Sequence, residues 1–314
     1  MADKIATREA YGNALAELGE KYENLVVLDA DLAAATKTGV FKKKFPERFF
    51  DCGIAENNMF GVAAGLSTAG KIPFASTFAM FAAGRSFEQI RNSIGYPGLN
   101  VKIGATHAGI SVGEDGATHQ CNEDIALMRT IPGMVILNPA DAVEARYAVE
   151  AAINYNGPVY LRFGRLAVPV INDKEGYTFE IGKGVLLAEG TDVTIVATGL
   201  MVEQALIARE ELEAEGISAS VVNIHTIKPL DTGLLLACAQ QTGAIVTTEE
   251  HNIIGGLGSA VCEALSGICP VPVVRHGVND LYGKSAPAKE LLSYYKLNAE
   301  GIKEKVYEAL KLKH

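Results

Sequence analysis

The sequence has 314 residues, of which 48% are hydrophobic and 21% are charged. This composition excludes a disordered or fibrous protein, and the length predicts about two domains. With 28 basic and 37 acidic side chains the formal net charge is −9, so the chain lacks the cationic surface of a nucleic-acid-binding protein. A chain this acidic that binds anionic metabolites must concentrate its cations locally.

Short apolar runs alternate with amphipathic helical patterns through the first half of the chain. The expected strands are Leu25–Asp29, Ile72–Ser76, Val101–Thr106, Val135–Asn138 and Val159–Arg162. The expected helices are Ala6–Lys21, Asn57–Ala69, Phe87–Ile94 and Ala140–Asn154. This alternation predicts a mostly parallel sheet with helices on both faces.

A second series of the same kind follows residues 168–191, where Pro, Gly and turn-forming residues indicate a connection. Its expected strands are Val193–Thr198, Ala219–Ile224, Ala244–Thr248 and Val271–Val274. Its expected helices are Val202–Glu215, Asp231–Thr242, Ser259–Gly267, Pro287–Tyr295 and Ala299–Leu312. We therefore predict an α/β fold with two domains, 1–167 and 192–314, joined by a linker at 168–191.

The cysteines and the apolar runs indicate the cellular compartment in which the protein is expected. The five cysteines are odd in number and form no C-x-x-C pair, which favours free thiols in a reducing compartment. Residues 1–16 mix charges with apolar residues, unlike a signal peptide. No apolar run approaches the roughly 20 residues of a membrane span. We expect a cytoplasmic protein with no membrane or nucleic-acid partner.

The densest polar cluster is residues 105–120, directly after an expected strand. It carries His107, Glu114, Asp115 and His119. Ligands of open α/β sheets bind beyond the carboxyl ends of strands, and histidines beside carboxylates suit proton transfer at neutral pH. A solvated surface loop is the alternative, and metal ligation by the two histidines lacks a standard spacing.

Glu56 lies at the start of an expected helix, where the helix dipole favours a carboxylate. Its neighbours are small and apolar, so two interpretations remain open: a buried proton donor, or a carboxylate that caps the first helical turn.

Three further motifs have both a structural and a functional interpretation. Phe78 and Phe81 follow a strand and, taken alone, are typical of core residues. Arg8, Arg162 and Arg165 are candidates for binding an anionic substrate. The G-G-L-G run at 255–258 lacks the third glycine of a dinucleotide-binding loop, so we give it no weight.

The order of these motifs resembles the C-terminal half of the transketolase family, a pyrimidine-binding domain followed by the transketolase C-terminal domain. The matching motifs span nearly the whole chain: T-R-E-A-Y-G at 7–12, D-C-G-I-A-E-N-N-M at 51–59, S-T-F at 76–78, G-I-S-V-G-E-D-G at 109–116, R-F-G-R at 162–165 and T-I-K-P-L-D at 226–231.

The resemblance implies a thiamine diphosphate (ThDP) enzyme that transfers a two-carbon ketol unit from a ketose phosphate to an aldose phosphate. In the family, the glutamate at the position of Glu56 hydrogen-bonds N1′ of the cofactor's aminopyrimidine and so activates the cofactor. Phe78 and Phe81 match the aromatic residues that pack on the pyrimidine ring. The resemblance thus implies that Glu56, His107 and His119 are catalytic, with His119 as a proton shuttle, and that Glu56, Phe78 and Phe81 bind the cofactor.

The resemblance also implies a substrate site. Arg8 and Arg165 match the arginines that bind the sugar phosphate, His107 and His119 lie near the substrate, and Asp115 matches the carboxylate that selects hydroxyl stereochemistry. Family members often have a phosphate-binding serine where this chain has Ala35, followed by Thr36. Thr36 is therefore the candidate replacement.

The family holds the diphosphate and its Mg²⁺ or Ca²⁺ through a G-D-G…N motif in an N-terminal domain, and no Gly-Asp-Gly occurs in these 314 residues. We therefore expect one subunit of a split transketolase, with no metal ligands of its own. It would be active only with an N-terminal-half partner, in an α2β2 assembly.

Other interpretations remain: a subunit resembling 1-deoxyxylulose-5-phosphate synthase or a 2-oxo acid dehydrogenase E1 β subunit, a transketolase for an unusual sugar phosphate, or a non-catalytic regulatory subunit.

Overall fold

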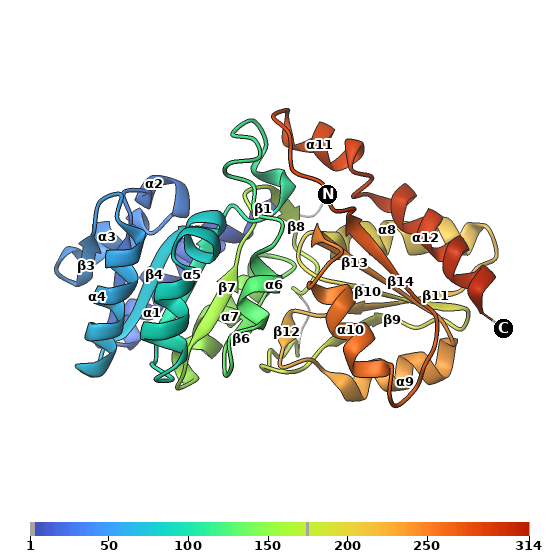
Figure 1. The fold of residues 1–314 in the computed structure, drawn as a ribbon, viewed down its shortest axis with the longest axis horizontal. Coiled ribbons are helices and arrows are strands. Elements are labelled where there is room, and N and C mark those ends of the chain that lie inside the picture. The colour runs from blue at the N-terminus through green and yellow to red at the C-terminus, as the bar shows by residue number, and fades with distance from the viewer. Residues whose placement is uncertain (1–3, 174–175, 314) are drawn as a thin grey trace.

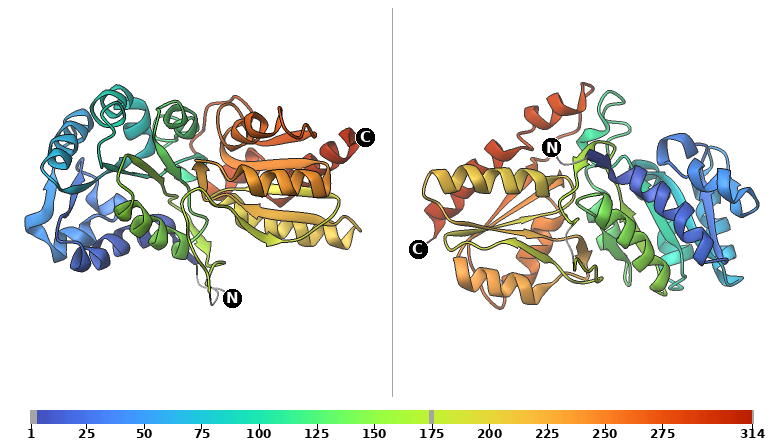
Figure 2. Two further views of the ribbon diagram at one scale, coloured as in Figure 1. Left: turned by 90° about the horizontal axis from the view of Figure 1, so that it is seen from below. Right: turned by 180° about the vertical axis from the view of Figure 1, so that it is seen from behind.

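The computed structural model describes residues 4–173 and 176–313. It is built around two large sheets, each covered by helices on both faces (Figures 1 and 2). The first sheet has the strand order β12-β6-β7-β5-β4-β2-β3. Its strands are β2 (Leu25–Asp29), β3 (Phe49–Asp51), β4 (Ile72–Phe78), β5 (Lys102–Thr106), β6 (Val135–Leu137), β7 (Val159–Arg162) and β12 (Thr226–Lys228). All neighbours in it are parallel except β12, which is antiparallel to β6.

The helices around the first sheet are α1 (Thr7–Lys21), α2 (Ala33–Thr36), α3 (Gly39–Lys44), α4 (Glu56–Thr68), α5 (Phe87–Gln89), α6 (Asp124–Arg129) and α7 (Ala142–Asn154). Met80–Arg85 and Ile90–Gly95 form π-helical turns, and Ile110–Val112 forms a 3-10 turn. A small antiparallel pair joins β1 (Lys4–Ala6) to β8 (Ala167–Pro169).

The second sheet has the order β14-β13-β10-β11-β9, and only its edge strand β9 is antiparallel. Its strands are β9 (Val185–Ala188), β10 (Val193–Ala197), β11 (Ala219–Asn223), β13 (Ile245–Asn252) and β14 (Val273–Val278). The flanking helices are α8 (Met201–Ala214), α9 (Thr232–Thr242), α10 (Leu257–Leu265), α11 (Ala288–Tyr294) and α12 (Ala299–Leu312).

Strand β2 shows why the chain folds in layers. Successive side chains of a strand point to opposite faces, and all of β2 is buried. Leu25 and Val27 pack in the apolar cluster that contains residues of α1 and α7. Val26 and Leu28 pack in the cluster that contains residues of α4.

The apolar core continues from one sheet to the other. The cluster beneath α4 also contains Val196 and Val222 of the second sheet and Leu257 of α10. A separate cluster fills the opposite face of the second sheet, beneath α8 and α12. The two sheets therefore share buried apolar surface, which supports a fixed position of one relative to the other.

The predicted fold class is confirmed, and the structure adds strands that the sequence did not predict. Residues 168–191, expected to be only a connection, include β9, which extends the second sheet. β12 follows β11 in the chain but pairs with β6 of the first sheet. Both are short edge strands, which carry little alternation for a sequence pattern to detect.

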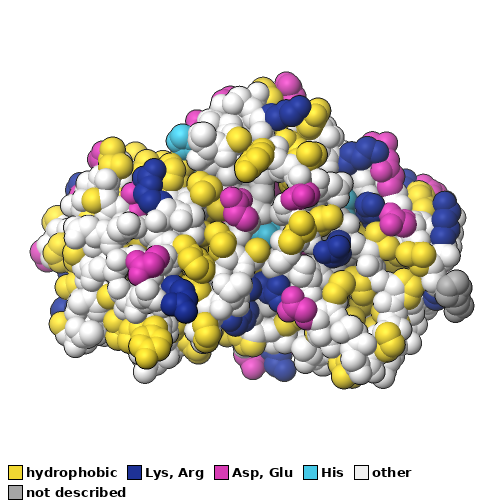
Figure 3. Space-filling view, viewed as in Figure 1, with side chains coloured by type: hydrophobic (Ala, Val, Ile, Leu, Met, Phe, Trp, Pro, Cys, Tyr) yellow, Lys and Arg dark blue, Asp and Glu magenta, His cyan; other side chains and the backbone are white. Residues whose placement is uncertain are grey.

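The molecular surface agrees with the composition. Within the residues that the structure describes, no helix is long and apolar enough to cross a membrane. Basic and acidic side chains are interspersed over the face shown in Figure 3.

Candidate active site

The predicted site residues gather at the carboxyl ends of the parallel strands of the first sheet. Phe78 ends β4, and Thr106 ends β5 directly before His107. We call residues 107–123 the β5–α6 loop. In Figure 1 the middle of this loop projects beside α11 of the second domain. The topology thus places the loop where open α/β sheets bind ligands.

Glu56 is the first residue of α4, and its side chain is 3% exposed. Its two carboxylate oxygens accept hydrogen bonds from Nη1 of Arg85, at 2.9 and 3.0 Å. Arg85 ends the π-helical turn at Met80–Arg85, and its guanidinium lies 4.6 Å from the centroid of the Phe81 ring. The sequence analysis did not identify Arg85 as a site residue. The signal that could have identified it is a basic residue shortly after Phe78 and Phe81.

Four rings cluster next to this ion pair. Phe78 and Phe81 are stacked, with centroids 5.7 Å apart and planes 10° apart. His107 stacks on Phe78 at 4.0 Å, and His119 meets Phe81 edge-on at 5.4 Å. The structure therefore brings together the phenylalanines and both candidate histidines, although Phe78 and His119 are more than forty positions apart in the sequence.

His107 is held as a neutral imidazole. Its Nε2 lies 3.2 Å from Nη1 of Arg8, which can only donate, so Nε2 is the acceptor. The ring proton is then on Nδ1, which lies 3.0 Å from Oγ1 of Thr106. Burial, with smaller contributions from nearby cations, lowers the pKa of His107 to about 3. Near pH 7 this side chain acts as a hydrogen-bonding group rather than as a cation.

Two guanidinium groups face the same region. Nη1 of Arg8 also donates to the carbonyl of Ala35 at 2.9 Å. Arg165 donates to the carbonyl of Val112 and contacts Oε2 of Glu114 at 3.0 Å. Burial lowers the pKa of Arg8, and Arg165 is close enough to contribute. The site thus concentrates positive charge in a chain of net negative charge.

Asp115 and Glu114 are both exposed residues of the β5–α6 loop. A backbone hydrogen bond and the neighbouring Arg165 lower the pKa of Glu114. Among the described residues, the side chain of Asp115 makes no hydrogen bond or ion pair that would orient it.

Thr36 does not fit the substrate-binding role suggested by its place in the sequence. The residue is completely buried, and its hydroxyl lies 2.7 Å from Oδ2 of Asp29, to which it donates. Oδ2 of Asp29 also accepts from Thr38 at 2.8 Å. The hydroxyl of Thr36 therefore stabilises the turn after β2 and is not available to a substrate.

Arg162 belongs to the interior rather than to the substrate site. Its guanidinium is 4% exposed and forms an ion pair with the fully buried Asp124, with Nε 2.8 Å from Oδ2. The pair links β7 to α6, and Arg162 also donates to the carbonyl of Glu250 in the second domain.

The chemistry of the Glu56 region fits one end of ThDP. A buried carboxylate can hold a proton between itself and a ring nitrogen, and aromatic rings can pack on a pyrimidine. Among residues 4–173 and 176–313, no cluster of His, Cys, Asp and Glu side chains is placed to hold a metal ion.

Comparison with known proteins covers both domains. Residues 3–170 match the model of the transketolase pyrimidine-binding domain, and residues 182–302 match that of the transketolase C-terminal domain. The chain is 52% identical to a putative transketolase C-terminal section of Methanocaldococcus jannaschii, over 97% of this chain and 96% of the relative. It is 44% identical to the 6-deoxy-6-sulfo-D-fructose transketolase subunit SqwH of a Clostridium species, over 98% of this chain and 95% of the relative.

A solved structure has the same fold over its full length. It is described as a split gene transketolase, an inactive beta4 tetramer, and it superposes with a TM-score of 0.91 at 57% identity. The match covers 99% of this chain and 100% of that chain.

Proposed function

The chain belongs to the transketolase family, and from this premise we propose that it is the C-terminal subunit of a two-subunit, ThDP-dependent transketolase. The observation that carries the proposal is the buried carboxylate of Glu56 beside the stacked rings of Phe78 and Phe81. The relatives described as a C-terminal section, a subunit and a split gene product support the two-subunit form.

The cofactor supplies the carbanion chemistry that cleaves and forms the carbon–carbon bond. Glu56 holds the proton at the pyrimidine nitrogen. Phe78 and Phe81 would hold the pyrimidine ring through stacking and apolar contacts. Arg85 neutralises the carboxylate of Glu56 from the solvent side.

The remaining residues bind and orient the sugar. Arg8 and Arg165 bind its anionic end through charge-assisted hydrogen bonds. His107, neutral and fixed by Arg8 and Thr106, binds a sugar hydroxyl in exchange for one of these two partners. Asp115 selects hydroxyl stereochemistry, and His119 moves protons between sugar and solvent.

The diphosphate and its Mg²⁺ or Ca²⁺ belong to an N-terminal-half partner that carries a G-D-G…N motif, and we expect an α2β2 complex in the cytoplasm. The relative described as an inactive beta4 tetramer is consistent with a need for the partner.

A transketolase for an unusual anionic sugar is the second candidate. It is favoured by the burial of Thr36, which leaves the turn after β2 without a free hydroxyl where family members often have a serine. One relative is described as acting on a sulfonated sugar.

The experiment is reconstitution. The chain and a partner carrying the G-D-G…N motif are co-expressed, purified together, and assayed for ketol transfer with ThDP, Mg²⁺ and a panel of phosphorylated and sulfonated ketoses. We expect activity from the complex and none from the chain alone. Robust transfer by the chain alone would refute the two-subunit proposal, and an inactive complex with stoichiometric bound ThDP would refute the enzymatic one.

A further inference from the structure

The β5–α6 loop carries His107, Asp115 and His119, so its conformation decides where these side chains lie. The backbone bends at Gly109, Gly113 and Gly116, which all have positive φ. Such bends are open to glycine at little steric cost, but they leave the chain flexible unless other contacts fix it. Besides contacts within the loop and with Arg165, several of the contacts that fix it come from the second domain.

Glu250 of β13 holds the first turn of the loop. The residue is 4% exposed, and its Oε1 accepts a hydrogen bond from the backbone amide of Ser111 at 2.5 Å. Burial raises the pKa of Glu250 to about 7. A carboxyl group in such a place is costly unless it is hydrogen-bonded, and the amide of Ser111 donates to it. The guanidinium of Arg162 and the side chain of Ser111 also favour its charged form.

Gln120 holds the other end of the loop. Its Nε2 carries two protons, which three carbonyls share; two of these are the carbonyls of Ile110 and Gly113 within the loop, at 3.2 and 3.1 Å. The same nitrogen lies 2.9 Å from the carbonyl of Lys284, just before α11. One buried amide group therefore joins two turns of the loop to the second domain.

The packing between the loop and the second domain leaves no room for a methyl group. A Cβ at Gly109 would lie 2.4 Å from Cδ of Glu250, and one at Gly116 would lie 2.3 Å from Oγ of Ser285. A Cβ at Gly283 would lie 1.6 Å from Oε1 of Gln120.

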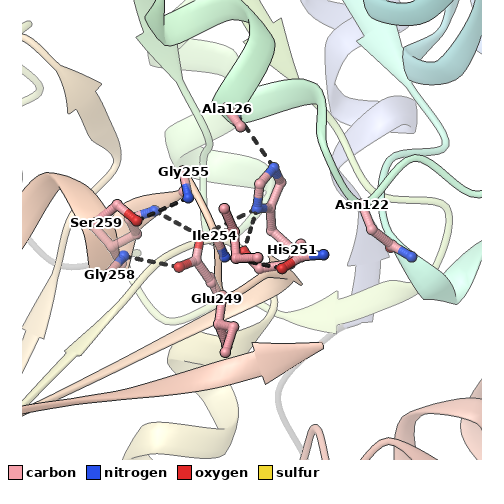
Figure 4. A network of polar contacts seen from close by, with 12 residues as sticks. Asn122, Ala126, Glu249, His251, Ile254, Gly255, Gly258 and Ser259 are labelled. Atoms are coloured by element: carbon pink, nitrogen blue, oxygen red, sulfur yellow. Dashed lines mark hydrogen bonds and ion pairs between the residues drawn. The ribbon is translucent and has the colours of Figure 1, made fainter. Parts of the chain in front are cut away.

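The strand that carries Glu250 is itself anchored. Glu249 accepts hydrogen bonds from the amides of Leu257 and Gly258 at the start of α10, at 2.6 and 2.8 Å (Figure 4). His251 accepts one from the amide of Ala126 in α6, at 3.4 Å. The amide of Asn252 donates to the carbonyl of Asn122, at the end of the loop. The residues on both sides of Glu250 are therefore fixed to the second domain, to α6 and to the loop.

We propose that the second domain, residues 192–314, acts as the support that holds the β5–α6 loop in its substrate-binding conformation, with Glu250 and Gln120 as positioning residues. Both are buried and act through the backbone that carries His107, Asp115 and His119. This inference rests on the proposed function, since it is the sugar site that they would position.

The first test compares Glu250→Ala with Glu250→Gln in the reconstituted two-subunit enzyme. Alanine leaves the amide of Ser111 buried without an acceptor, which we expect to raise KM for the sugar phosphate at least about tenfold. Glutamine keeps an acceptor of the same length and should restore KM to within about threefold of the wild type. KM for ThDP should rise less than KM for the sugar phosphate in both, because Glu56, Phe78 and Phe81 lie on other elements and only ring contacts join the phenylalanines to the loop. Equal losses in sugar and cofactor KM, or no loss, would overturn the proposal.

The second test needs no activity. Amide hydrogen exchange of Ser111 is measured in the full chain alone, and we expect it to be at least about tenfold faster in Glu250→Ala than in the wild type or Glu250→Gln. Gly283→Ala, which displaces Gln120, should also accelerate exchange in the loop. Gly267→Ala is the matched control, because a Cβ there meets nothing within 4 Å.

The two tests separate this inference from the proposed function. A wild-type complex that transfers no ketol group overturns the enzymatic proposal, whereas the exchange rate of Ser111 still decides the role of Glu250. Unchanged exchange in Glu250→Ala and Gly283→Ala would overturn the support role even in an active enzyme.

Discussion

Nη1 of Arg85 contacts both carboxylate oxygens of Glu56, at 2.9 and 3.0 Å, and so occupies the group that the proposed mechanism needs. The Glu56 side chain is 3% exposed, whereas half of the Arg85 side chain faces solvent. Arg85 can therefore withdraw toward water at little cost, but Glu56 cannot. A pyrimidine nitrogen that binds Glu56 must displace Arg85 or share the carboxylate with it.

The first prediction concerns this pair. Glu56→Gln keeps the size of the side chain but cannot hold the transferred proton, so kcat of the reconstituted complex should fall at least about a hundredfold. Arg85→Ala removes the half-exposed partner but leaves the carboxylate in place, so kcat should fall by much less than in Glu56→Gln. Both variants are compared by steady-state assay at saturating ThDP. Near-normal turnover in Glu56→Gln would contradict the assigned role.

The second prediction concerns the anionic end of the substrate. Arg8→Ala and Arg165→Ala should each raise KM for a phosphorylated ketose about tenfold or more, because a charge-assisted hydrogen bond is lost. KM for the same ketose without its phosphate should rise less, and only because the contacts of Arg8 with His107 and of Arg165 with the Val112 carbonyl are lost. Arg91→Ala serves as the control, because Arg91 is exposed and contacts the neighbouring Asn92. If KM rises equally for both ketoses, these arginines do not recognise the phosphate group.

Local sequence patterns and motifs predicted much of the fold and part of the candidate site. The buried apolar runs located β2 and β7 with the bounds that the structure has, because strands covered on both faces are apolar throughout. The motifs named Glu56, Phe78, Phe81, His107 and His119, and the structure places them around one cluster of rings.

Contacts between distant parts of the chain could not be predicted in this way. Thr36 follows the alignment position of a phosphate-binding serine, yet the nearby Asp29 binds its hydroxyl inside the domain. The contact between Ser111 and Glu250 joins residues 139 positions apart and leaves no periodic signal. Motifs give the order of residues along the chain, whereas tertiary packing decides which side-chain groups are free to bind a ligand.

The third prediction concerns the buried ion pair of Arg162 and Asp124. Arg162→Met leaves the carboxylate of Asp124 buried without its cation, so the free energy of unfolding should fall by about 3–5 kcal/mol. The variant Arg162→Met/Asp124→Leu removes both charges and should regain most of that loss. Urea unfolding followed by circular dichroism measures both effects. Lys305→Met is the control, since its exposed pair with Glu308 should contribute less than about 1 kcal/mol.

The last prediction concerns pH and the fully buried Glu144 of α7. Its carboxyl group accepts hydrogen bonds from the amide of Ala140, the hydroxyl of Tyr177 and the side chain of Asn223, at 2.8, 2.7 and 2.6 Å. Burial nevertheless raises the pKa of Glu144 from its ordinary 4.5 to about 7. Between these values the folded chain binds the proton more strongly than the unfolded chain does, so this carboxyl group makes folding less favourable as pH rises toward 7.

Glu144→Gln removes this titration. Relative to the variant, the wild type should be more stable at pH 5 than at pH 8, and the difference between the two pH values should reach at most about 3 kcal/mol. Any penalty from the glutamine NH2 group facing the amide of Ala140 is the same at both pH values and cancels in the comparison. Urea unfolding of both proteins at pH 5 and pH 8 measures the effect, with the exposed Glu189→Gln as a control that should show no such difference. A stability gap between wild type and Glu144→Gln that does not change with pH would mean that Glu144 keeps the same protonation state when the chain unfolds.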